Sequence, residues 1–398
     1  MAFADSVPEF VKRERPDRPV FCYRPDRLSA AGRWFAEHFP GECYYAVKAN
    51  PAPHILGGLW QAGIHGFDVA SMDEVEQVAR QLPDARLAYM HPVKSRGAIA
   101  RAYHEFGVRR FVLDCEEELD KIWEATGQAD DLYLVVRIAV SNEGASVPLH
   151  GKFGASQADV PGLLRAARSK ADELGISFHV GSQSHSPHAW HTAMADASAL
   201  ITRAAVTVDV VDVGGGFPSL YPGRVPPDLD AFMHVIDQSF ETMMVLENAE
   251  LWCEPGRALV AEAESLLVRV EAVRDDAVYI NDGGFGALYD AVHLGWDYPI
   301  RTMGENGLIG GDEKPFTVYG PTCDSADRFA KPLVLPKTIR AGDYIEFGQM
   351  GAYGRAMASR FNGYGAYDVV TVGDAPFETL FQTYEAAGTV TSLSVSNP

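Results

Sequence analysis

The sequence predicts a (β/α)8 barrel followed by an antiparallel β-domain, and three observations support that fold class. Short runs rich in β-branched and aromatic residues alternate with helical patterns as far as about residue 257. Polar or charged residues stand at the ends of these runs. Beyond about residue 262, short strands follow one another with few helical stretches between them. Repeated strand–helix–strand units form parallel sheets, and eight of them favour a closed barrel over the alternative, a doubly wound open sheet.

The predicted barrel occupies residues 25–260. Its helices are expected between the strands, for example at 73–82 and 160–174, where apolar residues recur at helical spacing. The eight candidate strands, in chain order, lie at 43–49, 66–71, 86–91, 109–114, 132–139, 177–182, 208–215 and 251–257. Because a helical stretch separates consecutive strands, neighbouring strands are expected to run parallel.

The predicted β-domain comprises residues 261–398 and is joined by residues 1–24, in which RPVFCY is a further candidate strand. Gly, Pro and Asp separate its apolar runs, as they do between antiparallel strands. Its strands are expected at 265–274, 277–282, 316–320, 343–348 and 367–372.

Length, composition and charge narrow the class of protein. A chain of 398 residues, of which 47% are hydrophobic, is long and apolar enough for two well-packed domains. The formal net charge of −20 opposes binding to a nucleic-acid backbone, which is also negative, but suits a cationic small molecule. The sequence contains neither a signal-peptide pattern nor an apolar run of membrane-spanning length, and its five cysteines lack metal-ligand spacing. We therefore expect a cytoplasmic protein with no metal, no membrane contact and no nucleic-acid partner.

Side chains suited to chemistry stand at or just beyond the C-terminal ends of the predicted barrel strands. In a parallel barrel these ends meet on one face, where the active sites of such barrels lie. Any one of these residues alone would pass for an ordinary loop residue, but their common position predicts one shared site. They are Lys48, Asp68, His91, Asp114, Arg137, His179, Gly214 to Gly216, Glu254 and Arg257.

Lys48 ends a mostly apolar strand, a position at which burial is expected. Burial disfavours the ammonium form and lowers the pKa, as a lysine that bonds a carbonyl carbon requires. The structural alternative is a lysine whose apolar stem lies along the barrel rim while its charge stays in water.

The residues that follow the last two predicted barrel strands suit an anionic, aromatic ligand. Glycines at 214–216 allow backbone N–H groups to approach an anion, and the paired N–H groups of Arg257 suit a phosphate. A buried Glu254 would keep a pyridine nitrogen protonated. The structural alternatives are a tight turn and a Glu254–Arg257 ion pair.

Two further motifs allow a functional and a structural interpretation. In HVGSQ, His179 could stack on a flat ring and Ser182 could bind phosphate, or both could be ordinary turn residues. In SMDE, Ser71 and Glu74 have the spacing of a capping box at the start of a helix, which explains Glu74 at least as well as a catalytic role does.

Taken together, the motifs of this chain resemble those of the fold-type III pyridoxal-phosphate decarboxylases, which act on ornithine, diaminopimelate and related basic amino acids. Between about residues 20 and 372 the chain contains, in order, YYAVKANP, FDVAS, HVGSQ, DVGGGFP, CEPGR, NDGGFGALYD, GPTCDSAD and MGAYGRAMASRFNGYG. Each motif is weak alone, but their common order is specific. The resemblance implies an alanine-racemase-like barrel with a C-terminal β-domain, pyridoxal 5'-phosphate as the cofactor, and a head-to-tail homodimer with shared active sites.

The resemblance also implies how the cofactor is held. Lys48 would bond it, Glu254 would pair with its ring nitrogen, and His179 would stack on its ring. Three further residues would line the cofactor side of the barrel mouth, namely Asp68, Glu74 and Arg137. The phosphate would be bound by Ser182, Gly215, Gly216, Arg257 and Tyr353.

On the substrate side, the resemblance brings the GPTCDSAD loop of a second subunit to the active site. Cys323 would protonate Cα after carbon dioxide leaves, and Asp324 would bind the distal ammonium group of the substrate. Phe285, in NDGGFG, would line the same pocket. Lys152 and Asp327 would pair across the subunit interface.

The acidic Asp324 favours L-ornithine, which gives putrescine and carbon dioxide in polyamine biosynthesis, because a carboxylate attracts an ammonium group. Diaminopimelate decarboxylases usually have CESGD in this loop and hold a distal carboxylate, so diaminopimelate is the less favoured alternative. The typical eukaryotic ornithine decarboxylase has tyrosine in place of Phe285 and a further aspartate with which neither Asp290 nor Asp297 aligns. One methylene is worth only about 1–3 kcal/mol of discrimination, so lysine alone, or both lysine and ornithine, are also alternatives.

Three other classes of protein share parts of this pattern. A non-catalytic binding protein, like the antizyme inhibitors, would not need Lys48, Glu254, Arg257 and Cys323, all of which are intact. Racemases on the same barrel lack a GPTCDSAD-type loop. Small pyridoxal-phosphate homeostasis proteins lack a C-terminal β-domain. Decarboxylation is therefore favoured over all three.

Overall fold

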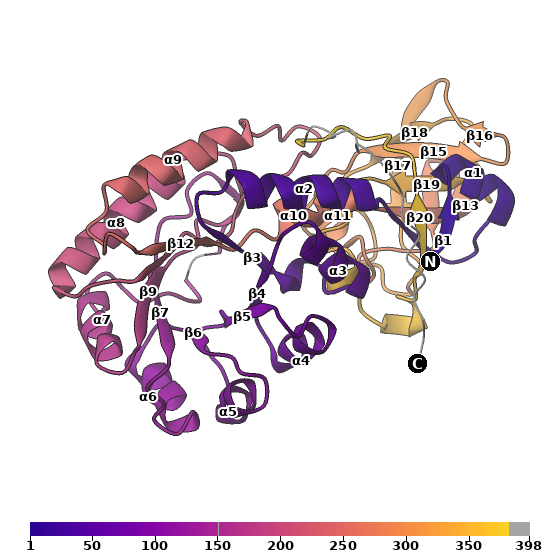
Figure 1. Cartoon of the computed structure of the whole chain (residues 1–398). Coiled ribbons are helices and arrows are strands. Elements are labelled where there is room, and N and C mark those ends of the chain that lie inside the picture. The colour runs from indigo at the N-terminus through magenta and orange to yellow at the C-terminus, as the bar shows by residue number, and fades with distance from the viewer. Residues whose placement is uncertain (150, 382–398) are drawn as a thin grey trace, which may run out of the picture.

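The computed structural model describes residues 1–149 and 151–381 and contains two large sheets, one closed and one open (Figure 1). The closed sheet is a barrel surrounded by helices, and the open sheet lies beside it. The predicted β-domain extends to residue 398, and its last part, 382–398, lies outside the described residues. Among the described residues, no helix is both long and apolar enough to cross a bilayer.

The barrel closes with all neighbouring strands parallel. Its strands are β3 (Glu42–Ala46), β4 (Gly66–Val69), β5 (Arg86–Tyr89), β6 (Arg110–Leu113), β7 (Tyr133–Arg137), β9 (Glu173–Ser177), β11 (Val210–Asp212) and β12 (Glu250–Cys253). The circle is completed where β12 pairs with β3. The predicted barrel is thus confirmed, and the open-sheet alternative is wrong because no barrel strand is left at an edge.

Helices cover the outside of the barrel (Figure 1). They are α2 (Pro25–His38), α3 (Pro53–Gln61), α4 (Met72–Gln81), α5 (Arg96–His104), α6 (Glu116–Ala125), α7 (Val160–Arg168), α8 (His188–Ala204) and α9 (Leu229–Glu241). In α4 the apolar Val75 and Val78 are buried, and Ser71 caps the helix by accepting a hydrogen bond from the Glu74 N–H at 3.3 Å. The amphipathic spacing of the sequence therefore directs one face of each such helix onto the barrel.

The sixth barrel strand lies earlier in the chain than predicted. Helix α7 ends at Arg168 instead of 174, and β9 spans Glu173–Ser177 instead of 177–182. Gly175 obscures this strand in the sequence, because glycine is a poor strand former. The crowded barrel favours a glycine here, since a Cβ would lie 3.1 Å from Val135 Cγ2 and 3.3 Å from Val210 Cβ. The predicted run instead ends in β10 (Ser182–Ser184), which pairs with β8 (Ala145–Val147).

The open sheet is built around the long strand β13 (Glu264–Arg274), which pairs antiparallel with three neighbours. These are β2 (Val20–Tyr23), β14 (Ala277–Ile280) and β19 (Tyr344–Phe347). The predicted strand in RPVFCY is therefore present as β2. The remaining strands are β1 (Ala2–Ala4), β15 (Ile300–Gly304), β16 (Gly307–Leu308), β17 (Glu313–Tyr319), β18 (Leu333–Pro336) and β20 (Asp368–Val372).

The open sheet also contains parallel pairings, which the sequence did not predict. Strand β20 runs parallel to β1 and β2, and β14 runs parallel to β17. Two short helices, α10 (Arg257–Val260) and α11 (Tyr289–His293), complete this half of the molecule together with α1 (Val7–Glu14) near the N-terminus. The sheet is thus antiparallel around β13 and mixed elsewhere.

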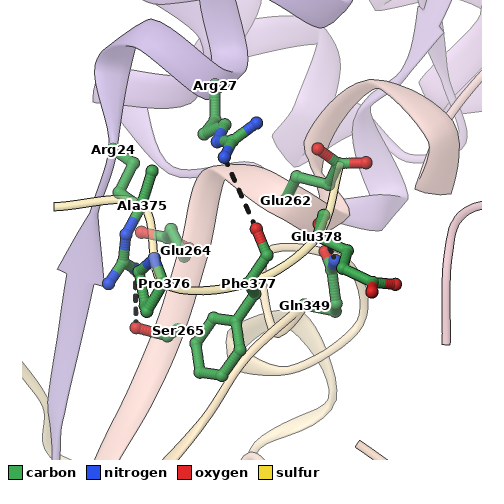
Figure 2. A pocket seen from close by; sticks show the side chains of 10 residues that line it. All are labelled: Arg24, Arg27, Glu262, Glu264, Ser265, Gln349, Ala375, Pro376, Phe377 and Glu378. Atoms are coloured by element: carbon green, nitrogen blue, oxygen red, sulfur yellow. Dashed lines mark hydrogen bonds between the residues drawn. The ribbon is translucent and has the colours of Figure 1, made fainter. Parts of the chain in front are cut away.

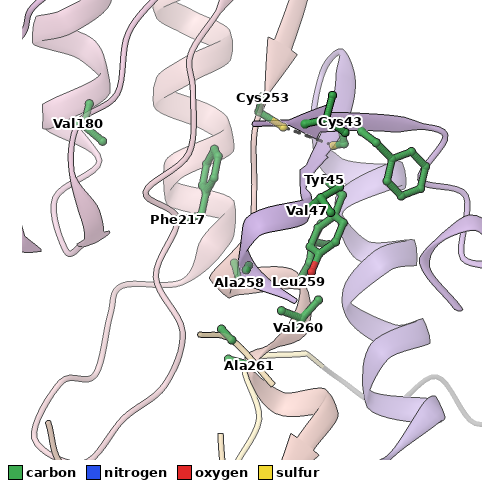
Figure 3. Close-up of a cluster of buried hydrophobic side chains, with 14 of the residues drawn as sticks. Cys43, Tyr45, Val47, Val180, Phe217, Cys253, Ala258, Leu259, Val260 and Ala261 are labelled. Carbon is green, nitrogen blue, oxygen red and sulfur yellow. Dashed lines mark hydrogen bonds between the residues drawn. The ribbon is translucent and has the colours of Figure 1, made fainter. Parts of the chain in front are cut away.

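Apolar side chains from both sheets form one continuous core. Tyr45 and Val47, at the end of β3, belong to the same buried cluster as Leu259 and Val260 of α10 (Figure 3). In this cluster the Sγ atoms of Cys43 and Cys253 lie 3.4 Å apart, where β3 and β12 close the barrel. The first and last barrel strands are therefore packed against the segment that leads into the open sheet.

Residues 374–381, which we call the strap, lie across the junction of the two sheets (Figure 2). Arg24, just before α2, donates to Glu346 Oε1 at 2.9 Å and to Asp374 Oδ1 at 3.1 Å. The Leu380 N–H donates to Glu262 Oε1 at 2.9 Å. Buried charges need such partners, so these contacts fix the strap to the body of the protein.

Candidate active site

A cavity of about 490 Å³ opens at the C-terminal ends of the barrel strands. This is the face on which the strand-end residues were expected to meet. Of the residues predicted for the cofactor site, those that line the cavity are Lys48, Arg137, His179, Ser182, Gly216, Glu254, Arg257 and Tyr353. The structure therefore brings together side chains that are spread over three hundred residues of sequence.

Lys48 lies in the 3-10 turn η1 (Val47–Ala49), directly after β3. Its neighbours Val47 and Ala49 are buried, but its own side chain is 45% exposed because it faces the cavity. Burial lowers its pKa, yet the nearby carboxylates of Asp68 and Glu254 raise it more, so the pKa lies above the ordinary lysine value. The expectation of a buried Lys48 with a lowered pKa is therefore wrong for the chain alone.

Asp68 is the group that controls the charge of Lys48. It stands in β4, next to β3, and is 2% exposed. Its Oδ2 accepts a hydrogen bond from Lys48 Nζ at 3.1 Å, while its Oδ1 has no partner among the described residues. A buried carboxylate this close favours the ammonium form of the lysine.

Glu254 follows β12 and is joined by a second acid, Asp212, which ends β11. Burial and the neighbouring Asp212 and Asp68 raise the pKa of Glu254 well above its ordinary value. Burial raises the pKa of Asp212 to about 7. Asp212 was missed in the sequence, although its place at a strand end before three glycines was the available signal.

His179 lies two residues beyond β9 and is uncharged. Burial, Arg137 and Lys48 lower its pKa well below the ordinary histidine value. Its Nδ1 accepts a hydrogen bond from the Gly181 N–H at 3.0 Å, so the proton of the neutral ring is on Nε2. A neutral, flat ring at the cavity wall is suited to stacking.

The glycines at 214–216 form a stretch of backbone whose conformation and close packing exclude residues with a side chain. Gly214 and Gly216 have φ of +66° and +105°, in the left-handed region. A Cβ at Gly214 would lie 2.0 Å from the Phe178 carbonyl oxygen, and one at Gly216 would lie 2.4 Å from that of Gly181. The backbone is therefore packed tightly behind and open toward the cavity.

Arg257 is held in place by aromatic side chains. Its Nη1 donates to the Tyr221 hydroxyl at 3.1 Å, and its Cζ lies 4.9 Å from the Trp296 ring and 4.8 Å from the Tyr353 ring. Its Nε has no acceptor in the described part of the chain, although the residue is 5% exposed. Since Arg257 lines the cavity, this free N–H fits an anionic group bound there. Tyr221 and Trp296 were not predicted from the sequence.

The position of Glu74 is explained by the start of its helix and not by a role in the cavity. Its Oε2 accepts a hydrogen bond from the Ala70 N–H at 2.7 Å, one residue before the N-cap Ser71, whose hydroxyl accepts from the Glu74 N–H at 3.3 Å. It is not among the residues that line the cavity. The structural interpretation of this motif is therefore the one that the geometry supports.

The loop with Cys323 and Asp324 lies in the open-sheet half, away from the cavity of its own chain. Cys323 is exposed, and its N–H donates to Asn362 Oδ1 at 3.2 Å. Asp324 caps the loop by accepting from the Ala326 N–H at 2.9 Å. Phe285 packs 4.8 Å from the Phe361 ring, also outside the cavity. A single chain does not bring these residues to Lys48.

Asp327 is buried within its own loop and is 1% exposed. Its carboxylate accepts hydrogen bonds from the Gly284 N–H at 2.8 Å, the Thr322 N–H at 3.1 Å and the Thr322 hydroxyl at 2.7 Å. The predicted pairing of Asp327 with Lys152 across an interface does not fit this arrangement. Asp327 instead ties the loop that carries Cys323 to the NDGGFG segment.

His91 and Asp114, the two strand-end residues for which no role was predicted, contact the loop at 151–154. Asp114 Oδ2 accepts from the Gly154 N–H at 2.9 Å, and the His91 ring lies 5.3 Å from the Phe153 ring. Lys152 Nζ lies 4.9 Å from the same ring. His91, Lys152 and Phe153 also line the cavity, so this loop forms part of its mouth.

Neither candidate for the second specificity aspartate reaches the cavity within one chain. Asp290, in α11, is 8% exposed, and burial raises its pKa while Arg257 lowers it. Asp297 pairs with Lys331 at 2.7 Å on the surface.

Comparisons with known proteins agree with the geometry. A family model described as the pyridoxal-binding domain of pyridoxal-dependent decarboxylases matches residues 26–261. The lysine/ornithine decarboxylase of Selenomonas ruminantium is 34% identical over 374 residues, covering 91% of this chain and 92% of that protein. The ornithine decarboxylase of Panagrellus redivivus is 34% identical over 347 residues, covering 80% and 77%. The crystal structure of Paramecium bursaria Chlorella virus arginine decarboxylase bound to agmatine matches with a TM-score of 0.81 at 25% identity, over 92% of this chain and 99% of that one.

The residues present fit pyridoxal 5'-phosphate as the cofactor. The cavity offers a lysine, the carboxyl group of Glu254, a flat neutral ring and an arginine with an N–H that has no acceptor among the described residues. Within residues 1–149 and 151–381 no cluster of three side chains could hold a metal ion. The chain belongs to the fold-type III pyridoxal-phosphate-dependent decarboxylases of basic amino acids, which are carboxy-lyases.

Proposed function

We propose that this chain decarboxylates L-ornithine to putrescine and carbon dioxide, as a cytoplasmic homodimer in polyamine biosynthesis. The observation that carries the proposal is the position of Lys48 beside Asp68 at the barrel mouth, with Glu254 on the wall of the same cavity. In this proposal the barrel, residues 25–260, binds the cofactor. The β-domain, residues 261–398 with 1–24, supplies the loop that meets the substrate.

The barrel residues have separate tasks in this reaction. When bound, pyridoxal phosphate supplies an electron-withdrawing ring that stabilises negative charge at the substrate Cα as carbon dioxide leaves. Lys48 Nζ must lose a proton before it can bond a carbonyl carbon, and until then its hydrogen bond to Asp68 Oδ2, 3.1 Å away, holds it at the barrel mouth. Glu254 would keep a proton on the ring nitrogen. His179, whose pKa is lowered well below the ordinary value, would pack against the ring without adding positive charge.

The phosphate end of the site is made of groups that hold an anion and do not react. Arg257 would place its unpaired Nε–H against a phosphate oxygen, which satisfies a buried donor. The N–H groups of Gly215 and Gly216 and the hydroxyl groups of Ser182 and Tyr353 would complete the binding set. These groups would hold the phosphate at one end of the cavity and so restrict the orientations open to the ring.

The substrate end requires a second subunit in this proposal, because Cys323 and Asp324 lie off the cavity of their own chain. Cys323 Sγ, which is exposed, would donate a proton to Cα after carbon dioxide has left. Asp324 would bind the side-chain ammonium of the substrate by charge attraction. An amino acid with a distal carboxylate would be repelled by the same group.

The test of the proposed substrate is kcat/KM for carbon dioxide release by the cofactor-loaded protein. L-ornithine, L-lysine, L-arginine and meso-diaminopimelate are compared at one pH. We expect ornithine to lead, with lysine within about two hundredfold, since one methylene gives no larger discrimination. Release mainly from arginine or diaminopimelate would contradict the choice of ornithine.

Asp324→Asn removes the negative charge that faces the substrate ammonium and preserves the shape of the side chain. We expect KM for L-ornithine to rise about tenfold or more, because one charge-assisted contact is lost. The matched control is Asp312→Asn, because Asp312 is 87% exposed and its one ion pair among the described residues is with Lys337. Equal KM values for the two variants would show that Asp324 does not bind the substrate.

A further inference from the structure

We propose that Asp212 is a positioning residue, which shares a single proton with Glu254 and thereby fixes the carboxylate that meets the ring nitrogen of the cofactor. This inference rests on the role proposed above for Glu254. Asp212 itself does not line the cavity, whereas Glu254 does. Asp212 therefore acts on the bound ring only through Glu254.

The main chain brings the two acids together and leaves them little freedom. Strands β11 and β12 are paired, and the pairing continues past Asp212, since the Val213 N–H donates to the Trp252 carbonyl at 2.9 Å. The Glu254 N–H then donates to the Gly214 carbonyl at 2.8 Å. Two acidic residues thus end neighbouring strands at the barrel mouth, where burial raises the pKa of Asp212 and hydrogen bonding with the side chain of Glu254 lowers it.

The carboxyl group of Asp212 has one satisfied and one unsatisfied oxygen. Its Oδ1 accepts a hydrogen bond from the Gly214 N–H at 2.8 Å. Its Oδ2 is buried and has no donor in the part of the chain that the structure describes, although the residue is only 1% exposed. An unsatisfied buried oxygen is costly. A proton on Oδ2 would turn this oxygen into a donor, and the carboxylate of Glu254, at the end of the neighbouring strand, would be its acceptor.

The charges around the pair favour one shared proton. The groups that face it are Asp68 from β4, Lys48 from η1, Arg137 from β7 and the neutral His179 from the end of β9. Three ionised acids would oppose two cations, whereas one shared proton leaves two negative and two positive charges. Two buried carboxylates in contact do not both ionise readily, and burial raises the pKa of each.

The shared proton gives Glu254 a fixed orientation. One of its oxygens is engaged by Asp212, so the other is directed toward the cavity, where the pair presents one negative charge. The structural alternative is that Asp212 only fixes the turn through the Gly214 N–H. That contact uses Oδ1 and survives in Asp212→Asn, whereas both contacts are lost in Asp212→Ala.

The experiment compares Asp212→Asn and Asp212→Ala as cofactor-loaded proteins without substrate. The readouts are the dissociation constant for pyridoxal phosphate and the pH midpoint of the absorption band of the bound cofactor. The asparagine amide donates where the shared proton did, so Asp212→Asn should keep both values close to those of the wild type. Asp212→Ala lacks a donor, so its dissociation constant should rise about tenfold or more, with a shifted midpoint.

Asp343→Asn is the matched control, because Asp343 is 3% exposed but lies in the open-sheet half. Among the described residues, the hydrogen bond that its side chain accepts comes from the Arg340 N–H. It should change neither readout. The proposal is overturned if Asp212→Ala matches the wild type, or if Asp212→Asn fails as badly as Asp212→Ala. The second result would mean that the negative charge of Asp212 is required, not its proton.

Glu254→Gln separates this inference from the proposed function. If Glu254→Gln shifts the absorption midpoint and Asp212→Ala does not, the role of Glu254 stands and only the role of Asp212 is overturned. If Glu254→Gln leaves the midpoint unchanged, Glu254 does not meet the ring nitrogen, and both the proposed role of Glu254 and this inference fail.

Discussion

At the residue scale, the charge state of a site group depends on which side chains the fold places beside it. The position of Lys48 at the end of an apolar run predicts a lowered pKa, but Asp68, 20 residues later, raises it. The sequence pattern identifies both residues as strand-end groups. It does not contain the side-chain conformations that bring Nζ within 3.1 Å of Oδ2. Tyr221 was missed for the same reason, since only the fold brings its hydroxyl to the predicted Arg257.

Asp282 provides a pH-dependent test at this scale. It is 1% exposed, and burial raises its pKa to about 7. An unfolded aspartate has a pKa near about 4, so the folded chain retains a proton that the unfolded chain releases between these values. The free energy of unfolding of the wild type should therefore fall relative to that of Asp282→Asn as pH rises from about 4 to about 7, by a few kcal/mol at most.

Urea unfolding at about pH 5 and about pH 8 measures this difference, because the first value lies below the folded pKa and the second lies above it. The exposed substitution Asp312→Asn is the control and should track the wild type at both pH values. If Asp282→Asn also tracks the wild type at both, the carboxyl of Asp282 does not titrate in this range.

At the element scale, the sequence predicts those helices and strands whose apolar residues recur with a strong period or whose ends are marked by polar residues. The strands that end at or near Lys48, Asp68 and Arg137 were predicted because apolar runs of β-branched and aromatic residues are bounded by polar ones. Strand β9 was misplaced because Gly175 interrupts its pattern, and packing in the crowded barrel favours a glycine there. The parallel pairings of β20 depend on contacts between the two ends of the chain, which no local pattern contains.

Gly216→Ala tests the tight backbone behind the glycine run. A Cβ there would lie 2.4 Å from the Gly181 carbonyl oxygen and 3.0 Å from Val180 Cγ2, at a φ of +105°. Because backbone atoms cannot move aside cheaply, the loop must shift, and we expect the affinity for pyridoxal phosphate to fall about tenfold or more. Absorbance titration of the cofactor measures this loss.

Gly223→Ala is the control for the glycine run. Gly223 also has a positive φ, +71°, but a Cβ there would have no atom within 4 Å. Gly223→Ala should lower the free energy of unfolding by about 1 kcal/mol through backbone strain and leave cofactor affinity unchanged. Equal affinity for both alanine variants would mean that the close approach at Gly216 is unimportant.

At the scale of the whole molecule, the order of strands and helices predicted the barrel, and the change of pattern after it predicted a second sheet. The strap was not predicted, because the C-terminal segment to which it belongs shows no apolar periodicity. Its contacts are with residues that lie far away in the sequence. Arg24 makes those contacts from a buried position, being 5% exposed, toward Glu346, Ser265 and Asp374. This network joins the first barrel helix, the open sheet and the strap.

Arg24→Ala tests whether that network stabilises the fold. Removing one partner leaves the buried Glu346 with only Arg301 as a cation among the described residues, so we expect a loss of about 3 kcal/mol or more in the free energy of unfolding. The control is Arg15→Ala, whose pair with Glu305 is 58% and 57% exposed and should contribute under about 1 kcal/mol. Urea unfolding of both variants gives the comparison, and similar small losses would contradict a stabilising network.

The central claim is that Lys48 bonds the cofactor at the mouth of this barrel. The most direct measurement is borohydride reduction of the cofactor-loaded protein, followed by proteolysis and mass spectrometry of the lysine-containing peptides. The account predicts a phosphopyridoxyl group on Lys48, with the label lost in Lys48→Ala. A label on Lys152, which also lines the cavity, with Lys48 unmodified, would contradict the account.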